Sequence, residues 1–215
     1  MRRAVRLWPL LFVWLFLGAT CSESSINQDI HDTFGINTDS PVQVAGVILL
    51  GKKFGNAEEQ QAADMGSTIK DFRRADHEQK GDRARDARDY DGAEREYREA
   101  LQWTGTGPQQ DIKRADLETR LGETLAWKAV FGERVSQERE AAQHYGTAAA
   151  LREKDPAYQK NPGAIGELYL NQAFASLNAR DWGASCSALR KAAAKGRDNP
   201  DLRADLKNNG LTCDR

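Results

Sequence analysis

Along most of this chain, apolar residues recur three or four positions apart with charged residues between them, the spacing of amphipathic helices. Met65, Ile69 and Phe72 form the first such stripe, after a helix start at Asn56, and we expect all three to pack in the core. An earlier apolar run, 42–50, follows Ser40-Pro41. The proline start favours a helix there, although its valines and isoleucine leave a strand open.

From residue 74 onward the same period predicts three helical pairs and a short last helix. The expected ranges are 74–88 with 91–103, 111–131 with 134–154, 164–179 with 182–195, and 200–208. Clusters of glycine, proline, asparagine and aspartate separate the pairs, at 105–108, 155–163 and 198–200. The pattern therefore predicts an all-α protein. Alternatively, the first of these helices continues without a break from Asn56.

The first 20 residues have the layout of an export signal, with three arginines, an apolar run 7–17 and a small-residue tail. The run is shorter than the roughly 20 residues of a membrane-spanning helix, and Pro9 interrupts it. We therefore expect cleavage and export to the periplasm or cell envelope. The predicted organisation is an export signal (1–20), a polar tether (21–40), N-terminal helices (41–73), paired helices (74–195) and a capping helix with a tail (196–215).

Cys21 directly follows Leu17-Gly18-Ala19-Thr20, which resembles a degenerate bacterial lipobox, in which the cysteine is lipidated. Gly18 and Thr20 depart from the usual residues of that motif, so lipidation and ordinary cleavage nearby both stay open. Membrane contact is expected only through such a lipid or an uncleaved signal. The other two cysteines, Cys186 and Cys213, form an even pair for a disulfide in an oxidising compartment, and two buried free thiols are the alternative.

The charge balance argues against a nucleic-acid partner. Without the leader, which holds three arginines and no acid, 28 basic residues remain against 32 acidic residues, a net charge of −4. Arg83, Arg85 and Arg88 alternate with aspartates instead of forming a basic patch. This segment is typical of a solvated helix face.

Small and aromatic residues recur at matching places in the helical pairs. The first pair has Gly81, Tyr90, Ala93, Tyr97 and Ala100; the third has Ala173, Trp182, Ser185, Leu189 and Ala192; and the middle one has Leu121, Gly122, Leu125, Ala142 and Ala149. This pattern resembles the tetratricopeptide repeat, in which small residues let two antiparallel helices approach and a large residue fills the adjacent gap. The resemblance implies a short α-solenoid of about three helix pairs, with extra N-terminal helices and a C-terminal capping helix.

The repeat is irregular. In the outer pairs the two small residues are 12 positions apart, whereas Ala142 follows Gly122 by 20, so the middle pair carries about eight extra residues. His77 and Lys80 stand where the family prefers large apolar residues. An irregular helical bundle without a binding groove is therefore the alternative.

The resemblance implies that the first helices of successive pairs line a surface that binds a protein or peptide partner. The residues expected on that groove are Glu123, Ala126, Trp127, Phe174, Leu177 and Asn178. Trp127 and Phe174 are the strongest candidates, because aromatic residues dominate binding hot spots, and burial of both in the core is the alternative. The expected role is a scaffold or adaptor of the cell envelope. The alternatives are a lipid-anchored, pilotin-like or assembly accessory of an envelope machine, and an enzyme or small-ligand receptor using helices 41–72.

No catalytic, metal or cofactor site is expected. Asp89, Asp91 and Gly92 suggest a calcium loop, but Ala87 and Arg98 stand where two of its oxygen ligands belong. We therefore expect these acids to serve as turn and N-cap residues. His31, His77 and His144 are distant from the cysteines and from each other, which gives no zinc set and no Cys–His nucleophile pair.

Overall fold

The computed structural model describes residues 57–132 and 135–213, and the chain divides into two compact units, Met1–Ile69 and Lys70–Arg215. Over the described residues the protein is all-α, with eight helices and no strand. The export signal, Cys21, the tether and the apolar run 42–50 lie outside the described residues. In the described ranges, every helix is too short or too polar to span a bilayer.

The observed helices match the predicted ranges within a few residues at each end, except that the first helix begins at 57 rather than 74. The helices are α4 (Ala57–Asp86), α5 (Tyr90–Trp103), α6 (Pro108–Gly132), α7 (Val135–Glu153), α8 (Pro156–Gln159), α9 (Pro162–Asn178), α10 (Trp182–Ala194) and α11 (Pro200–Asn208). We refer to α4 with α5 as the first pair, α6 with α7 as the middle pair, and α9 with α10 as the third pair. Prolines begin α6, α8, α9 and α11, where a missing backbone N–H costs no hydrogen bond.

The first helix differs from its main prediction. α4 is one helix from Ala57 to Asp86, so it does not begin at 74, and the alternative of a continuous helix is the observed one. The expected core stripe is wrong at Phe72, whose residue surface is 61% exposed. A three-to-four-residue period identifies an apolar face but does not establish that another helix covers it.

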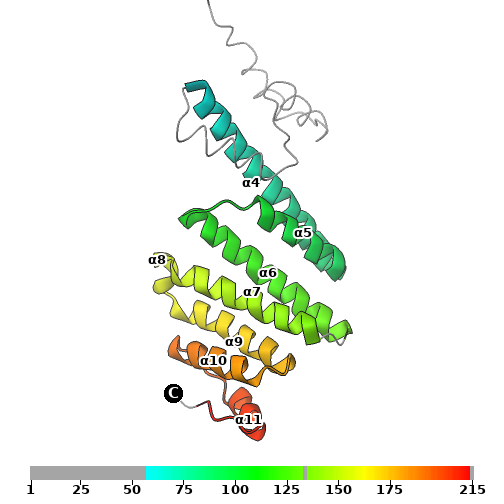
Figure 1. The fold of residues 1–215 in the computed structure, drawn as a ribbon, viewed down its shortest axis with the longest axis vertical. Coiled ribbons are helices and arrows are strands. Elements are labelled where there is room, and N and C mark those ends of the chain that lie inside the picture. Colours follow the sequence, from blue (N-terminus) through cyan, green and yellow to red (C-terminus); the bar gives the residue numbers. More distant parts are fainter. Residues whose placement is uncertain (1–56, 133–134, 214–215) are drawn as a thin grey trace, which may run out of the picture. The chain divides into compact units, whose positions relative to one another are not determined.

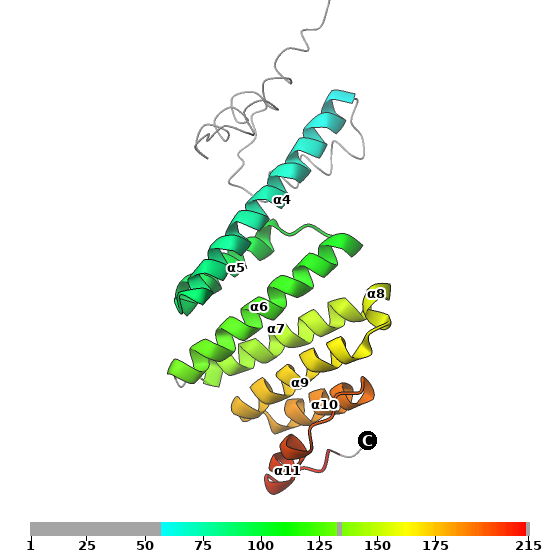
Figure 2. The same ribbon diagram turned by 180° about the vertical axis from the view of Figure 1, so that it is seen from behind.

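Within the second unit, helices that follow each other in the chain pack against each other. α5 contacts α6, α6 contacts α7, α7 contacts α9, α9 contacts α10, and α10 contacts α11, while the short α8 bridges α7 and α9. Figures 1 and 2 show the same order of neighbours from opposite sides, with the two helices of the middle and third pairs running antiparallel.

The turns of the first and third pairs have the same backbone. Arg88 and Arg180 have φ of 61° and 58°, and they are the two non-glycine residues with positive φ in the described ranges. The next residue caps the following helix in both turns: Asp89 Oδ1 accepts from Gly92 N at 2.9 Å, and Asp181 Oδ1 accepts from Ala184 N at 3.0 Å. This shared geometry aligns the two pairs with an offset of 92 residues.

Close helix packing depends on the predicted small residues. A Cβ added to Gly81 would lie 2.6 Å from Tyr97 Cε1, and one added to Gly122 would lie 3.2 Å from Tyr145 Cδ1. In the third pair, Ser185 Oγ donates to the carbonyl of Ala173 at 2.8 Å. The predicted residues that make these contacts are all buried: Gly81, Tyr97, Gly122, Ala173 and Ser185. Ala93, Ala100, Ala142 and Leu189 are buried as well.

The middle pair is longer than its neighbours at one end. Tyr97 follows Gly81 by 16 residues, whereas Tyr145 follows Gly122 by 23, a difference of seven rather than eight. Five residues of α4 follow Gly81, but ten residues of α6 follow Gly122. This register aligns Ala141, rather than Ala142, with Ala93, although both alanines of the middle pair are buried.

The C-terminal end has its own core and a covalent lock. Leu202 and Leu206 of α11 pack with Ala173 and Leu189 of the third pair. Cys186 of α10 is bonded to Cys213, with Cα atoms 5.4 Å apart, which confirms the predicted disulfide. α11 therefore covers the last pair, as predicted for a capping helix.

Candidate functional site

Two of the residues predicted to bind a partner are exposed aromatic side chains. Trp127 on α6 is 52% exposed and Phe174 on α9 is 39% exposed, so the alternative that both are core residues is wrong. We call the surface formed by Glu123, Trp127, Phe174, Leu177 and Asn178, with Glu138 of α7 beneath it, the α6–α9 face. Its surface residues are those that the sequence predicted for a partner, and Glu138 is an addition.

These residues occupy equivalent positions on α6 and α9. Glu123 and Phe174 each follow the small residue of their first helix by one position, and Trp127 and Asn178 follow it by five. On α4 the residue next to Gly81 is Asp82, which accepts a 2.7 Å hydrogen bond from the hydroxyl of Tyr97. α7 contacts both α6 and α9, so the residues of the α6–α9 face come from two helices that share this neighbour.

Glu138 is the unusual group of this face. Its residue surface is 7% exposed, Oε1 accepts a 3.2 Å hydrogen bond from Asn178 Nδ2, and Oε2 has no hydrogen-bond partner. Burial raises the pKa of Glu138, and the bond from Asn178 lowers it by less. A buried polar atom without a partner costs about 1–3 kcal/mol, so this carboxylate has an acceptor that remains unused in the isolated chain.

Tyr145 connects Glu138 to α6. The ring of Tyr145 packs on Gly122, and burial raises the pKa of its hydroxyl, with further contributions from the charges of Glu123 and Glu138. The two carboxylates therefore act on one hydroxyl between α6 and α9. Glu123 also forms an ion pair with Arg85 at 3.5 Å, whereas Glu138 has only the neutral amide of Asn178 as a hydrogen-bond partner.

An aromatic row continues from Trp127 to the extended end of the middle pair. Trp127 stacks on Phe131 with centroids 6.3 Å apart, and Phe131 stacks on Tyr90 at 5.7 Å. Val130, Phe131 and Val135 are all exposed at this end. The extra residues of α6 therefore carry apolar surface into solvent instead of adding to the core.

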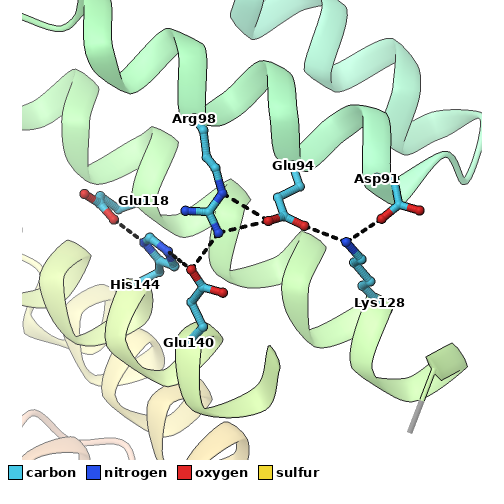
Figure 3. Close-up of polar contacts among 7 residues, drawn as sticks. All are labelled: Asp91, Glu94, Arg98, Glu118, Lys128, Glu140 and His144. Carbon is cyan, nitrogen blue, oxygen red and sulfur yellow. Dashed lines mark hydrogen bonds and ion pairs between the residues drawn. The ribbon is translucent and has the colours of Figure 1, made fainter. Parts of the chain in front are cut away.

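A chain of alternating charges fastens the first pair to the middle pair. Figure 3 shows Lys128 of α6 between Asp91 and Glu94 of α5, Arg98 between Glu94 and Glu140, and His144 between Glu140 and Glu118. Burial by itself would raise the pKa of Glu94, but hydrogen bonds from Lys128 and Arg98 outweigh it, and the net pKa is lowered. Glu94 therefore stays ionised at neutral pH, and the network serves to hold helices together.

Two histidine–glutamate contacts join helices within pairs. His77 Nδ1 lies 2.9 Å from Glu96 Oε2, and His144 Nδ1 lies 2.5 Å from Glu118 Oε2. Glu118 is 5% exposed and also lies 3.6 Å from Arg114 Nε. Both histidines are held by carboxylates on the partner helix, so these contacts help to join the two helices of each pair.

A shallow depression of about 520 Å³ lies on α4. It is lined by Phe72, Ala75, Asp76, Glu78, Gln79 and Asp82. Arg120 of α6 approaches both Glu78 and Asp82, at 3.0 and 2.7 Å. The acids of this depression are therefore partly neutralised.

The other predicted site residues have mixed outcomes. Leu177 is half-buried and packs against the C-terminal core, which leaves less of it for a partner, whereas Asn178 is exposed but engaged with Glu138. Asp89 is an N-cap residue, as expected. In the part of the chain that the structure describes, no group of histidine, cysteine and carboxylate side chains is arranged to hold a metal ion.

Glu138 and Tyr145 were not predicted as part of the site. Glu138 has no distinctive spacing in the sequence, because acids are frequent throughout these helices. The Gly81–Tyr97 contact does point to Tyr145: the same spacing counted from Gly122, with seven inserted residues, ends at Tyr145. Comparison with protein-family models, with curated protein sequences and with solved structures finds no match.

Proposed function

We propose that this protein is an exported scaffold or adaptor that binds a protein or peptide partner through the α6–α9 face, in the manner of a tetratricopeptide repeat protein. The observation that carries the proposal is the exposure of Trp127 and Phe174 on successive first helices. Large aromatic side chains are enriched among the residues that dominate binding free energy, and exposing them to water is unfavourable without a partner.

The order of packing supports a surface function rather than catalysis. Each pair contacts its neighbours in the chain, which leaves one side of the first helices open to a partner. The equivalent turns at Arg88 and Arg180 support a repeat origin for the first and third pairs. The disulfide supports export, because such bonds persist in oxidising compartments.

Affinity capture from an envelope extract of the source cells tests the proposal. Full-length protein carrying Trp127→Ala or Phe174→Ala should lose a partner that the unmodified protein retains, with an unchanged urea midpoint for each variant. Phe72→Ala is the matched control, because Phe72 is an exposed aromatic residue outside the α6–α9 face. Retention of every partner by both variants, or a loss confined to Phe72→Ala, would overturn the proposal.

The lipid-anchored accessory remains the second prediction, and it concerns Cys21, outside the described residues. Mass spectrometry of the mature N-terminus separates it from simple cleavage. A diacylglyceryl group on Cys21 supports the anchored form, and a free cleaved end contradicts it.

A further inference from the structure

We infer that the partner segment bound by the α6–α9 face presents a lysine or arginine side chain next to a large apolar side chain, with the cation bound by Glu138. The inference rests on the proposed function and adds the chemistry of the partner. The apolar side chain would pack on Trp127 or Phe174.

The first step is the missing cation. Among the described residues, Glu138 Oε2 has no hydrogen-bond partner, and the hydrogen bond to Oε1 comes from the neutral amide of Asn178. Buried carboxylates in proteins are normally paired with a cation or receive several hydrogen bonds. A lysine ammonium or an arginine guanidinium supplies both a charge and donors, whereas an acidic or purely apolar segment supplies neither.

The second step is the charge of the surroundings. Glu123 and Glu138 both act on Tyr145, so the carboxylates of α6 and α7 add their negative potential at one place. Glu123 is partly neutralised by its ion pair with Arg85 at 3.5 Å, whereas no ion pair to Glu138 is formed among the described residues. A positively charged side chain is therefore attracted to this place, and a negatively charged one is repelled.

The third step is access. The hydrogen bond to Glu138 Oε1 comes from Asn178, which is itself exposed. An incoming cation that displaces this amide can bind the carboxylate and donate to Oε2 as well. The exposed side chains of Trp127 and Phe174 offer apolar contact, and an aromatic face also attracts a cation directly.

A random twelve-residue peptide library displayed on phage, selected on the immobilised full-length protein, tests the inference. We expect enriched peptides to carry lysine or arginine within two positions of tryptophan, phenylalanine, leucine or isoleucine. A synthetic peptide of the enriched sequence should bind the Glu138→Gln variant at least tenfold more weakly than the unmodified protein. Replacing its cationic residue with norleucine should cause a similar loss on the unmodified protein and little further loss on the variant.

Glu99→Gln is the matched control, since Glu99 lies on α5 and contacts Gln102. Its affinity for the peptide should equal that of the unmodified protein. Glutamine at 138 keeps an oxygen for Asn178, so folding should be retained, and a urea midpoint checks it. Enrichment of acidic peptides, or no enrichment at all, contradicts the inference.

The same variants test the binding face and the bound cation separately. If Trp127→Ala and Phe174→Ala abolish peptide binding but Glu138→Gln changes affinity by less than twofold, the face is correct and the cation is wrong. If none of the three variants changes the affinity, the proposed binding face itself is wrong.

Discussion

Glu118 occupies on α6 the position that His77 occupies on α4, four residues before the glycine that contacts a tyrosine ring. Their partners also correspond, since Glu96 and His144 each directly precede that tyrosine. The first and middle pairs therefore contain the same cross-helix contact with histidine and glutamate exchanged. In the third pair, Tyr169 and Ala188 stand at these positions, and both are buried.

This exchange predicts that the contact can be reversed. His144→Ala should destabilise the protein by about 1–3 kcal/mol, because the buried Glu118 loses its closest hydrogen-bond partner. The double variant Glu118→His with His144→Glu should recover most of that loss, since the first pair already uses this arrangement. Urea unfolding of the single and double variants measures the coupling. Simple addition of the single effects would contradict it.

Close approach at Gly81 predicts a difference between two similar substitutions. Gly81→Ala should destabilise by about 1–3 kcal/mol, because its Cβ would meet the fully buried Tyr97 ring and outweigh the gain in helix propensity of about 1 kcal/mol. Gly122→Ala should be nearly neutral, because its nearest ring atom is 3.2 Å away. Thermal unfolding compares the two variants, and equal midpoints would contradict the expectation. Gly81→Ala with Tyr97→Leu recreates the Ala173–Leu189 combination and should relieve the clash.

Removal of the disulfide should lower the free energy of unfolding. Cys186 and Cys213 are 27 residues apart, and a loop of this size is worth about 3–4 kcal/mol in the chain-entropy model. Cys186→Ser with Cys213→Ser should lower the free energy of unfolding by about that amount and weaken the packing of α11 first. Hydrogen exchange across α11 measures the local effect. Alkylation of both cysteines without reductant would show that the bond is absent in solution.

Glu138 predicts a pH dependence with a definite sign. Burial raises its pKa in the folded state, so the folded protein holds this proton to higher pH than the unfolded chain does, and stability falls as pH rises through that window. Glu138→Gln should therefore be more stable than the unmodified protein at pH 7. The difference should shrink as the pH falls below about 4, because the carboxyl group then becomes protonated in the unfolded chain as well as in the folded protein. Urea midpoints at the two pH values test this, and a less stable variant at pH 7 would contradict it.

The last prediction separates folding from binding. A Glu138→Gln variant that is more stable and yet binds a cationic peptide more weakly cannot owe its weaker binding to unfolding. Stability and binding are commonly opposed where a binding site retains an unsatisfied polar group.

The sequence by itself determined the helical class and the positions of the turns. It also predicted the N-cap role of Asp89 and the pairing of Cys186 with Cys213, with two free thiols as the alternative to that pairing. Each of these depends on local chemistry, on the period of apolar residues or on cysteine number, all of which are visible along the chain. The sequence also identified Trp127 and Phe174 as surface candidates, although it left their burial in the core open.

Only the tertiary structure decided which apolar faces are covered. Phe72 and Ile69 belong to one stripe, but Phe72 is exposed. Helical periodicity identifies an apolar face and does not specify whether another helix covers it. The register of the middle pair and the exchange of His77 and Glu118 likewise required the Gly122–Tyr145 contact. Glu138 became distinctive only when burial removed water from a carboxylate that no cation pairs with, and that is a property of the packed helices rather than of any spacing in the chain.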